Sequence, residues 1–290
     1  MRSGWRRAFG VAAIVVWVAG SSGQAAARAQ DEPLGGGTCV AGATGIGDGY
    51  FPTTGNGGYD VRHEALDLEI DVERSEILAA TATIEALAVE DLCSFNLDFE
   101  GLRIDGITVD GEGAQRSRHG KELTVTPARA IAAGDAFTVE VRYSGTPIIQ
   151  PGLGDGPARG QETPSEAPGV GGGDPNEDAG LAGGWFVAED EIFVLGEPTG
   201  NRTWFPLNEH PADKATYSFR YTVAEPYVVV GNGVKVDEVD NGDTTTFVYA
   251  SADPIANYLV TFHAGRLDVE ELEGPGGLPV TLSFAPTVPE

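Results

Sequence analysis

Apolar and polar side chains alternate along most of this chain, and this alternation restricts the fold more than any other feature of the sequence. Between residues 65 and 72, for example, Leu66, Leu68 and Ile70 alternate with Asp67 and Glu69. A repeat of two is the spacing of a β-strand that buries one face. Comparable runs cover residues 77–89, 95–99, 102–109, 123–125, 137–143, 185–187, 192–195, 216–223, 227–230, 234–239, 245–249, 258–262 and 279–284.

Turn-forming residues separate these runs. Asp110-Gly111 and Asp240-Asn241-Gly242-Asp243 are examples, and the second supplies the positive φ angles that a tight hairpin needs. No stretch carries the apolar stripe of an amphipathic helix. We therefore expect an all-β fold, an antiparallel sandwich or barrel of short strands.

The first 29 residues have the three regions of a secretory signal peptide. Arg2, Arg6 and Arg7 precede an apolar run over residues 9–18, and small residues follow up to Ala27-Arg28-Ala29. The apolar run is much shorter than the ~20 residues of a membrane-spanning helix. We expect cleavage after Ala29, a secreted protein and no stable membrane span. Both the general and the twin-arginine export routes fit this segment.

Charge and cysteine content exclude several classes of function. The formal net charge of −26 argues against nucleic acid or an anionic membrane as partner, because both repel an acidic protein. Two cysteines are too few for a disulfide-dense scaffold or a cysteine-only zinc site. In an oxidising compartment Cys39 and Cys93 could pair, and two free thiols are the alternative.

Two glycine-rich segments interrupt the strand pattern. Residues 30–57 lack apolar periodicity, and we interpret them as a loosely ordered leader. Residues 147–184 are rich in glycine and proline and carry almost no large apolar side chains, so they cannot bury enough surface to offset their ordering entropy. This second segment is either a flexible insertion, which we favour because strand-like runs resume directly after it, or a linker between two β-halves.

The histidines form no recognisable metal motif. His63-Glu64 begins a His-Glu-x-x-His pattern, but the fifth residue is Asp67 and the segment alternates like a strand. Residues 63 and 67 of a strand lie ~13 Å apart, too far to share one zinc ion. Glu209, His210 and Asp213 invite a metal or acid–base interpretation, but the prolines around them favour a turn with surface charges.

The most specific segment runs from Glu197 to Tyr217 and reads EPTGNRTWFPLNEHPADKATY. Physically it contains a buried aromatic pair, Trp204 and Phe205, then a charged turn, then a strand that begins near Ala215. It resembles the Glu-Pro-x-x-x-Arg-x-x-Phe-Pro-x-x-Asp-x-Pro-x-x-Lys-Ala-x-Tyr stretch of the aminopeptidase N family, which are zinc metallopeptidases. Gly231-Asn232-Gly233, the segment 253–260 and the opening 57–61 extend the resemblance over roughly residues 50–290.

This resemblance implies that residues 58–290 form the family's amino-terminal β-domain, a saddle-like assembly of sheets that packs on a catalytic domain. Glu197 matches the family's glutamate that binds the free α-amino group of the substrate, whereas Leu195 stands where the family usually has glutamine. The resemblance also implies zinc in the complete enzyme and peptide amino termini as substrates.

The family's remaining catalytic motifs are absent from the sequence. The Gly-x-Met-Glu-Asn strand would need a methionine, and Met1 is the only one. We therefore expect the chain alone to bind no zinc and to be inactive, its partner being a catalytic domain further along. The alternative is a non-catalytic extracellular β-sandwich, either a binding module or a pseudoenzyme.

Overall fold

A computed structural model describes residues 38–150, 183–188 and 191–286. The signal peptide expected at 1–29 and most of the expected insertion at 147–184 lie outside these residues. The described part is almost entirely strand and turn, so the all-β expectation is confirmed. Its helical segments are three single turns, η1 (Asn201–Thr203), η2 (Asn257–Leu259) and η3 (Pro275–Gly277). No helix in these ranges has the length and apolar character needed to cross a membrane.

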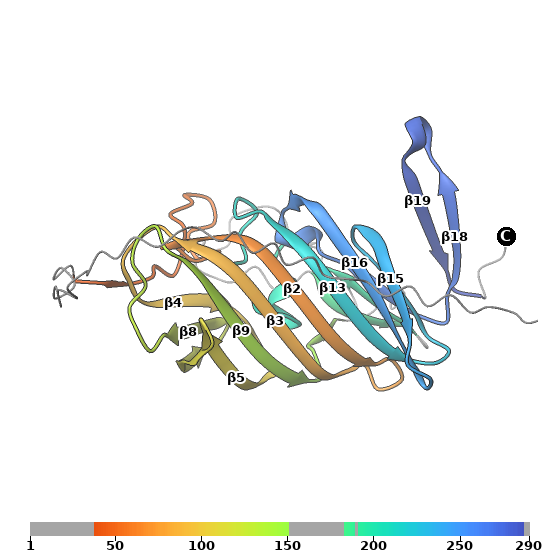
Figure 1. Ribbon diagram of the computed structural model, residues 1–290, viewed down its shortest axis with the longest axis horizontal. Helices are drawn as coiled ribbons and strands as arrows, with labels where there is room; N and C mark the ends of the chain where they lie inside the picture. Colours follow the sequence, from red (N-terminus) through yellow and green to blue (C-terminus); the bar gives the residue numbers. More distant parts are fainter. Residues whose placement is uncertain (1–37, 151–182, 189–190, 287–290) are drawn as a thin grey trace, which may run out of the picture. The chain divides into compact units, whose positions relative to one another are not determined.

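The main sheet has eight strands in the order β15-β16-β13-β2-β3-β9-β5-β6 (Figure 1). Their bounds are β2 (Tyr59–Asp71), β3 (Glu76–Ala88), β5 (Arg103–Val109), β6 (Glu112–Gly113), β9 (Ala136–Gly145), β13 (Ala215–Ala224), β15 (Val234–Asp240) and β16 (Thr244–Ile255). Strands β2 and β13 pair in parallel, from His63 opposite Thr216 to Ile70 opposite Val223. The sheet is therefore mixed and not purely antiparallel as expected, because alternation within a strand carries no information on the direction of its neighbour.

Three smaller sheets complete the described fold. The first has the order β1 (Val40–Ala41), β4 (Leu92–Asp98), β8 (Glu122–Thr126) and β7 (Gln115–His119). The second has the order β10 (Ile149–Gln150), β11 (Gly184–Ala188), β12 (Glu191–Leu195), β17 (Phe262–Gly265) and β14 (Val228–Gly231). The third is the hairpin of β18 (Asp268–Glu273) and β19 (Pro279–Phe284), which projects from the other sheets in Figure 1.

Aromatic side chains fill the space between the main sheet and the sheet that contains β12. Phe262 of β17 lies with its ring centroid 5.4 Å from those of both Trp185 and Trp204, and 5.0 Å from that of Tyr221 in β13. Trp204 and Phe205 are fully buried, as the sequence predicts. Such rings contribute both buried apolar area and favourable edge-to-face contacts. The core therefore lies directly beneath the segment that begins at Glu197.

The strand expected over residues 258–262 is wrong. Residues 257–259 form η2, and β17 begins at Phe262. Polar contacts override the apolar pattern here, because the Asn257 carbonyl accepts a hydrogen bond of 2.6 Å from the Asn201 side chain, and the Asn257 side chain donates to the Asn208 carbonyl. These bonds turn the chain toward the interior before the strand can start.

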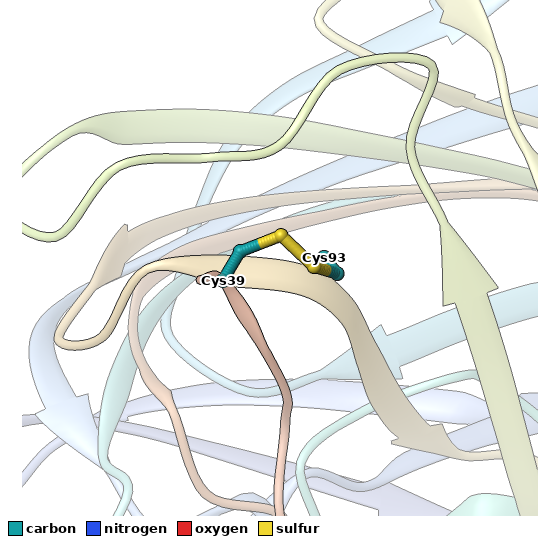
Figure 2. The surroundings of a disulfide bond; sticks show 2 residues. All are labelled: Cys39 and Cys93. Carbon is teal, nitrogen blue, oxygen red and sulfur yellow. A yellow bond between two sulfur atoms is a disulfide. The ribbon is translucent and has the colours of Figure 1, made fainter. Parts of the chain in front are cut away.

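A disulfide joins Cys39, next to β1, to Cys93 in β4 (Figure 2). The two Cα atoms are 5.1 Å apart, and β1 pairs in parallel with β4 beside the bridge. Further along, Asn56 is fully buried. Residues 38–57 are thus held by one covalent bond, a two-residue strand and polar contacts, none of which produces apolar periodicity. The boundary of the leader at residue 57 stays a prediction.

Replacing both Cys39 and Cys93 by serine should lower the free energy of unfolding by about 4 kcal/mol, because the bridge restricts the unfolded chain across a separation of 54 residues. Urea unfolding of the oxidised protein and of the variant measures the difference. The variant should not respond to a reducing agent. A parent protein whose unfolding midpoint also stays constant after reduction would contradict the prediction.

Candidate functional site

Glu197 lies in a surface turn that follows β12 and precedes η1. Its side chain is exposed, and the amide of Gly200 closes the turn with a hydrogen bond of 2.8 Å to the carbonyl of Gly196. The Glu197–Pro198 peptide bond is cis. Within the described part of the chain, the Glu197 carboxylate has no hydrogen-bond or ion-pair partner. The residue that the sequence singled out therefore carries an exposed negative charge that is open to a ligand.

Close backbone packing fixes the base of this turn. A Cβ atom on Gly183 would lie 2.6 Å from the carbonyl oxygen of Glu197, and one on Gly200 would lie 2.1 Å from the carbonyl carbon of Gly183. Real Cβ atoms do not approach other atoms so closely, so only glycine fits at either position. The chain at Gly183, directly before β11, thus packs closely against the backbone of the Glu197 turn.

Asn201 connects the turn to η2 and to the aromatic core. Its fully buried amide donates to the carbonyls of Asn257, at 2.6 Å, and Val260, at 3.1 Å. Its side-chain oxygen accepts a hydrogen bond of 2.8 Å from the indole of Trp204. Both donors and the acceptor are therefore used, and the short helical turn after Glu197 is tied to elements that are distant in sequence.

Arg202 connects the same turn to the buried Glu209 and to the partly exposed Glu100. Its guanidinium donates to the carbonyl of Thr199 at 2.9 Å, to Oε2 of Glu209 at 2.8 Å and to Oε2 of Glu100 at 3.2 Å. The backbone amide of Arg202 donates to Oε1 of Glu209 at 3.1 Å. Only 4% of the Arg202 side chain and 3% of the Glu209 side chain are exposed, so the ion pair is shielded from water.

The surface turn expected around Glu209 and His210 is wrong, because both residues are buried. The Glu209 amide donates to the Asp98 carboxylate at 2.9 Å, and Nε2 of His210 lies 3.3 Å from the Asp48 carboxylate. Prolines and charged residues are typical of surface turns, and for this reason the sequence predicts a surface position for Glu209 and His210. The partners Asp48 and Asp98 lie more than 100 residues away, and no local signal indicates them.

The His63-Glu64 pair does not form a metal site. Strand β2 contains both residues, and the His63 ring contacts the hydroxyl oxygens of Thr216 and Ser218 at 2.8 and 3.1 Å. Glu64 points into the core. The described residues contain no group of three or more histidine, cysteine or carboxylate side chains that could hold a metal ion. They therefore do not fit a catalytic zinc ion.

Burial instead raises the pKa of several carboxyl groups. It raises the pKa of Glu64 well above its usual range, and the nearby Asp213 adds to the shift. Burial raises the pKa of Asp213 to about 7, although that carboxylate accepts hydrogen bonds from the Val61 amide and the Asn208 side chain. Burial likewise raises the pKa of Glu209 to about 7 against the opposing attraction of Arg202.

These raised pKa values predict that the chain loses stability as the pH rises. The folded state retains protons on Glu64 and Asp213 at a pH where the unfolded state has released them. The free energy of unfolding should therefore fall between about pH 5 and pH 8. Urea unfolding across this range measures it. Glu64→Gln should reduce the fall, whereas Glu69→Gln, at an exposed position of the same strand, should not. A free energy of unfolding that increases with pH would contradict the prediction.

Comparison with known proteins finds solved structures that share this fold. No protein-family model and no curated protein matches the sequence. An M1 zinc metallopeptidase from Deinococcus radiodurans, solved with and without a bound Tyr-Ser-Ala substrate, shares 24% sequence identity with a TM-score of 0.67. A two-domain M1 zinc metallopeptidase bound to L-arginine shares 23% identity with a TM-score of 0.68. Each alignment covers 84% of this chain and 52% of the other.

The likeness is one of fold, and it confirms the fold that the resemblance implies. This chain spans about half the length of the structures that it matches, since 52% of each is covered. The described residues thus adopt an architecture that occurs within M1 zinc metallopeptidases.

Proposed function

We propose that this chain is the amino-terminal portion of an exported zinc aminopeptidase. In the complete enzyme it shapes the substrate cleft and presents Glu197 to the free α-amino group of a peptide. The observation that carries this proposal is the exposed Glu197 carboxylate, which has no partner among the described residues and lies on a turn with a fixed backbone. The fold shared with zinc metallopeptidases, one of them bound to a tripeptide, supports it further.

The attraction between the Glu197 carboxylate and an ammonium group explains why such an enzyme would prefer peptides with a free amino terminus. An ammonium group next to a carboxylate gains a charge-assisted hydrogen bond, which becomes stronger where a second domain excludes water. A peptide bond inside a chain offers no such charge. An enzyme that relies on this contact therefore removes residues from the amino terminus and does not cut within the peptide.

The catalytic metal belongs to another part of the complete enzyme in this proposal. The described residues offer no group of ligands for zinc. Their contribution is to bind and orient the substrate through Glu197. A chain that continues beyond Glu290 with a His-Glu-x-x-His segment agrees with the proposal. A stop codon directly after Glu290 would favour the non-catalytic binding module or pseudoenzyme.

Changing Glu197 to alanine in the complete enzyme should raise the KM for peptides with a free amino terminus by about 10- to 100-fold, because a hydrogen bond to a charged group contributes roughly 1.5–3 kcal/mol. Steady-state kinetics with a dipeptide amide measures the change. Glu69→Ala, on an exposed part of the main sheet, serves as the control and should leave the KM unchanged. If Glu197→Ala keeps the parent's KM and its preference for free amino termini over acetylated ones, the role of Glu197 is refuted.

Export predicts a defined amino terminus for the mature protein. Cleavage after Ala29 removes four arginines and no acidic residue, and the mature chain should begin at Gln30. Mass spectrometry of the protein recovered outside the cytoplasm checks this terminus. Replacing Ala27 and Ala29 by bulky residues should block processing. A chain that retains residues 1–29 outside the cytoplasm would contradict the predicted cleavage.

A further inference from the structure

The guanidinium group of Arg202 lies between the Glu197 turn and the interior of the domain. On one side it donates to the carbonyl of Thr199, two residues after Glu197. On the other side it donates to Glu209 and Glu100. The Glu100 amide in turn donates to the Arg202 carbonyl at 2.8 Å. One side chain thus connects the exposed turn to two separate segments of the chain.

Stability alone is a weak explanation for a buried ion pair of this kind. Removing two charges from water costs about as much as their attraction returns, and apolar residues of similar volume often serve equally well. What the planar guanidinium adds is direction, since its donors leave the group at fixed angles. Here those angles determine where the Thr199 carbonyl lies relative to Glu209.

The other contacts of the turn do not fix the position of the Thr199 carbonyl, and Arg202 does. The Gly196–Gly200 hydrogen bond closes the turn, and Gly183 supports it from behind. Among the side-chain hydrogen bonds of the described residues, the bond from Arg202 is the one that reaches the Thr199 carbonyl. A turn held in this way orders its backbone before a ligand arrives, so binding needs to immobilise only the Glu197 side chain.

From this geometry we propose that Arg202 is a positioning residue for Glu197 and that Glu209 holds Arg202 in place. The proposal rests on the proposed function of Glu197 as the group that binds the substrate amine. Arg202 itself touches no substrate. It acts by fixing the turn from which the Glu197 carboxylate projects.

Hydrogen exchange on the 290-residue chain tests the structural part. Arg202→Lys keeps the charge but cannot reproduce the fork of donors. It should speed exchange of the Gly200 amide at least tenfold while amides of the main sheet exchange as before. Arg220→Lys, at an exposed ion pair with Asp67, is the matched control and should change neither. If Arg202→Lys does not fold, Glu209→Gln, which keeps the shape of the side chain, should give the same local effect. Unchanged exchange at Gly200 in a folded variant would overturn the proposal.

A double-mutant cycle in the complete enzyme tests the functional part. Arg202→Lys alone should raise the KM for free-amine peptides about tenfold with little change in kcat. In a Glu197→Ala background it should have no further effect, because the group that it positions is gone. Additive effects would mean that Arg202 acts independently of Glu197 and would overturn the proposal.

The two experiments separate this proposal from the function on which it rests. If Glu197→Ala leaves the KM unchanged, the amine-binding role fails and the positioning role fails with it, whatever the exchange at Gly200 shows. If Glu197→Ala raises the KM but Arg202→Lys does not, Glu197 binds the amine without help from Arg202. In that case only the positioning proposal is refuted.

Discussion

The whole arrangement depends on the burial of ten consecutive residues, 201–210, most of which lie outside regular secondary structure. A buried irregular segment has peptide groups that no sheet ladder satisfies, and each unsatisfied group costs free energy. Side chains provide the partners here. Asn201, Asn208 and Asn257 bond to one another's backbone or to neighbouring carbonyls, while Glu209 accepts from the amide of Arg202. Without these bonds the segment could not remain inside the domain.

The buried segment 201–210 explains why the neighbouring Glu197 turn has a fixed backbone. The Glu197 turn precedes the segment, and β13 of the main sheet follows it from Ala215. The aromatic rings of Trp204 and Phe205 face the core, while Asn201 and Arg202 face the turn. Polar contacts to the turn and apolar packing on the core therefore come from neighbouring residues of one short stretch. A large apolar core beneath a rigid turn is a suitable base for an exposed charged group.

The sequence predicts the strands well because each one buries a single face, as Leu66, Leu68 and Ile70 illustrate. It also predicts the hairpin at Asn241-Gly242, because residues that accept positive φ angles indicate the turn locally. Gly242 does adopt a positive φ of 96°. It does not predict the parallel pairing of β2 with β13 or the burial of Glu209 and His210. These depend on partners far away in the chain, such as Asp98. The choice of Glu197 came from a resemblance and not from periodicity, and the structure adds its exposure and its fixed backbone.

The bridge between Cys39 and Cys93 also affects how the buried segment acquires its partners. Asn56 donates to Asp98 from 42 positions away and accepts from Asn208. Once the two sulfur atoms are joined, the covalent path between Asn56 and Asp98 is roughly half as long, and halving a loop lowers its closure cost by about 0.6 kcal/mol. Formation of the disulfide therefore brings Asn56 more readily to Asp98 and Asn208. The redox state of the surroundings thus influences how readily the interior of the domain forms.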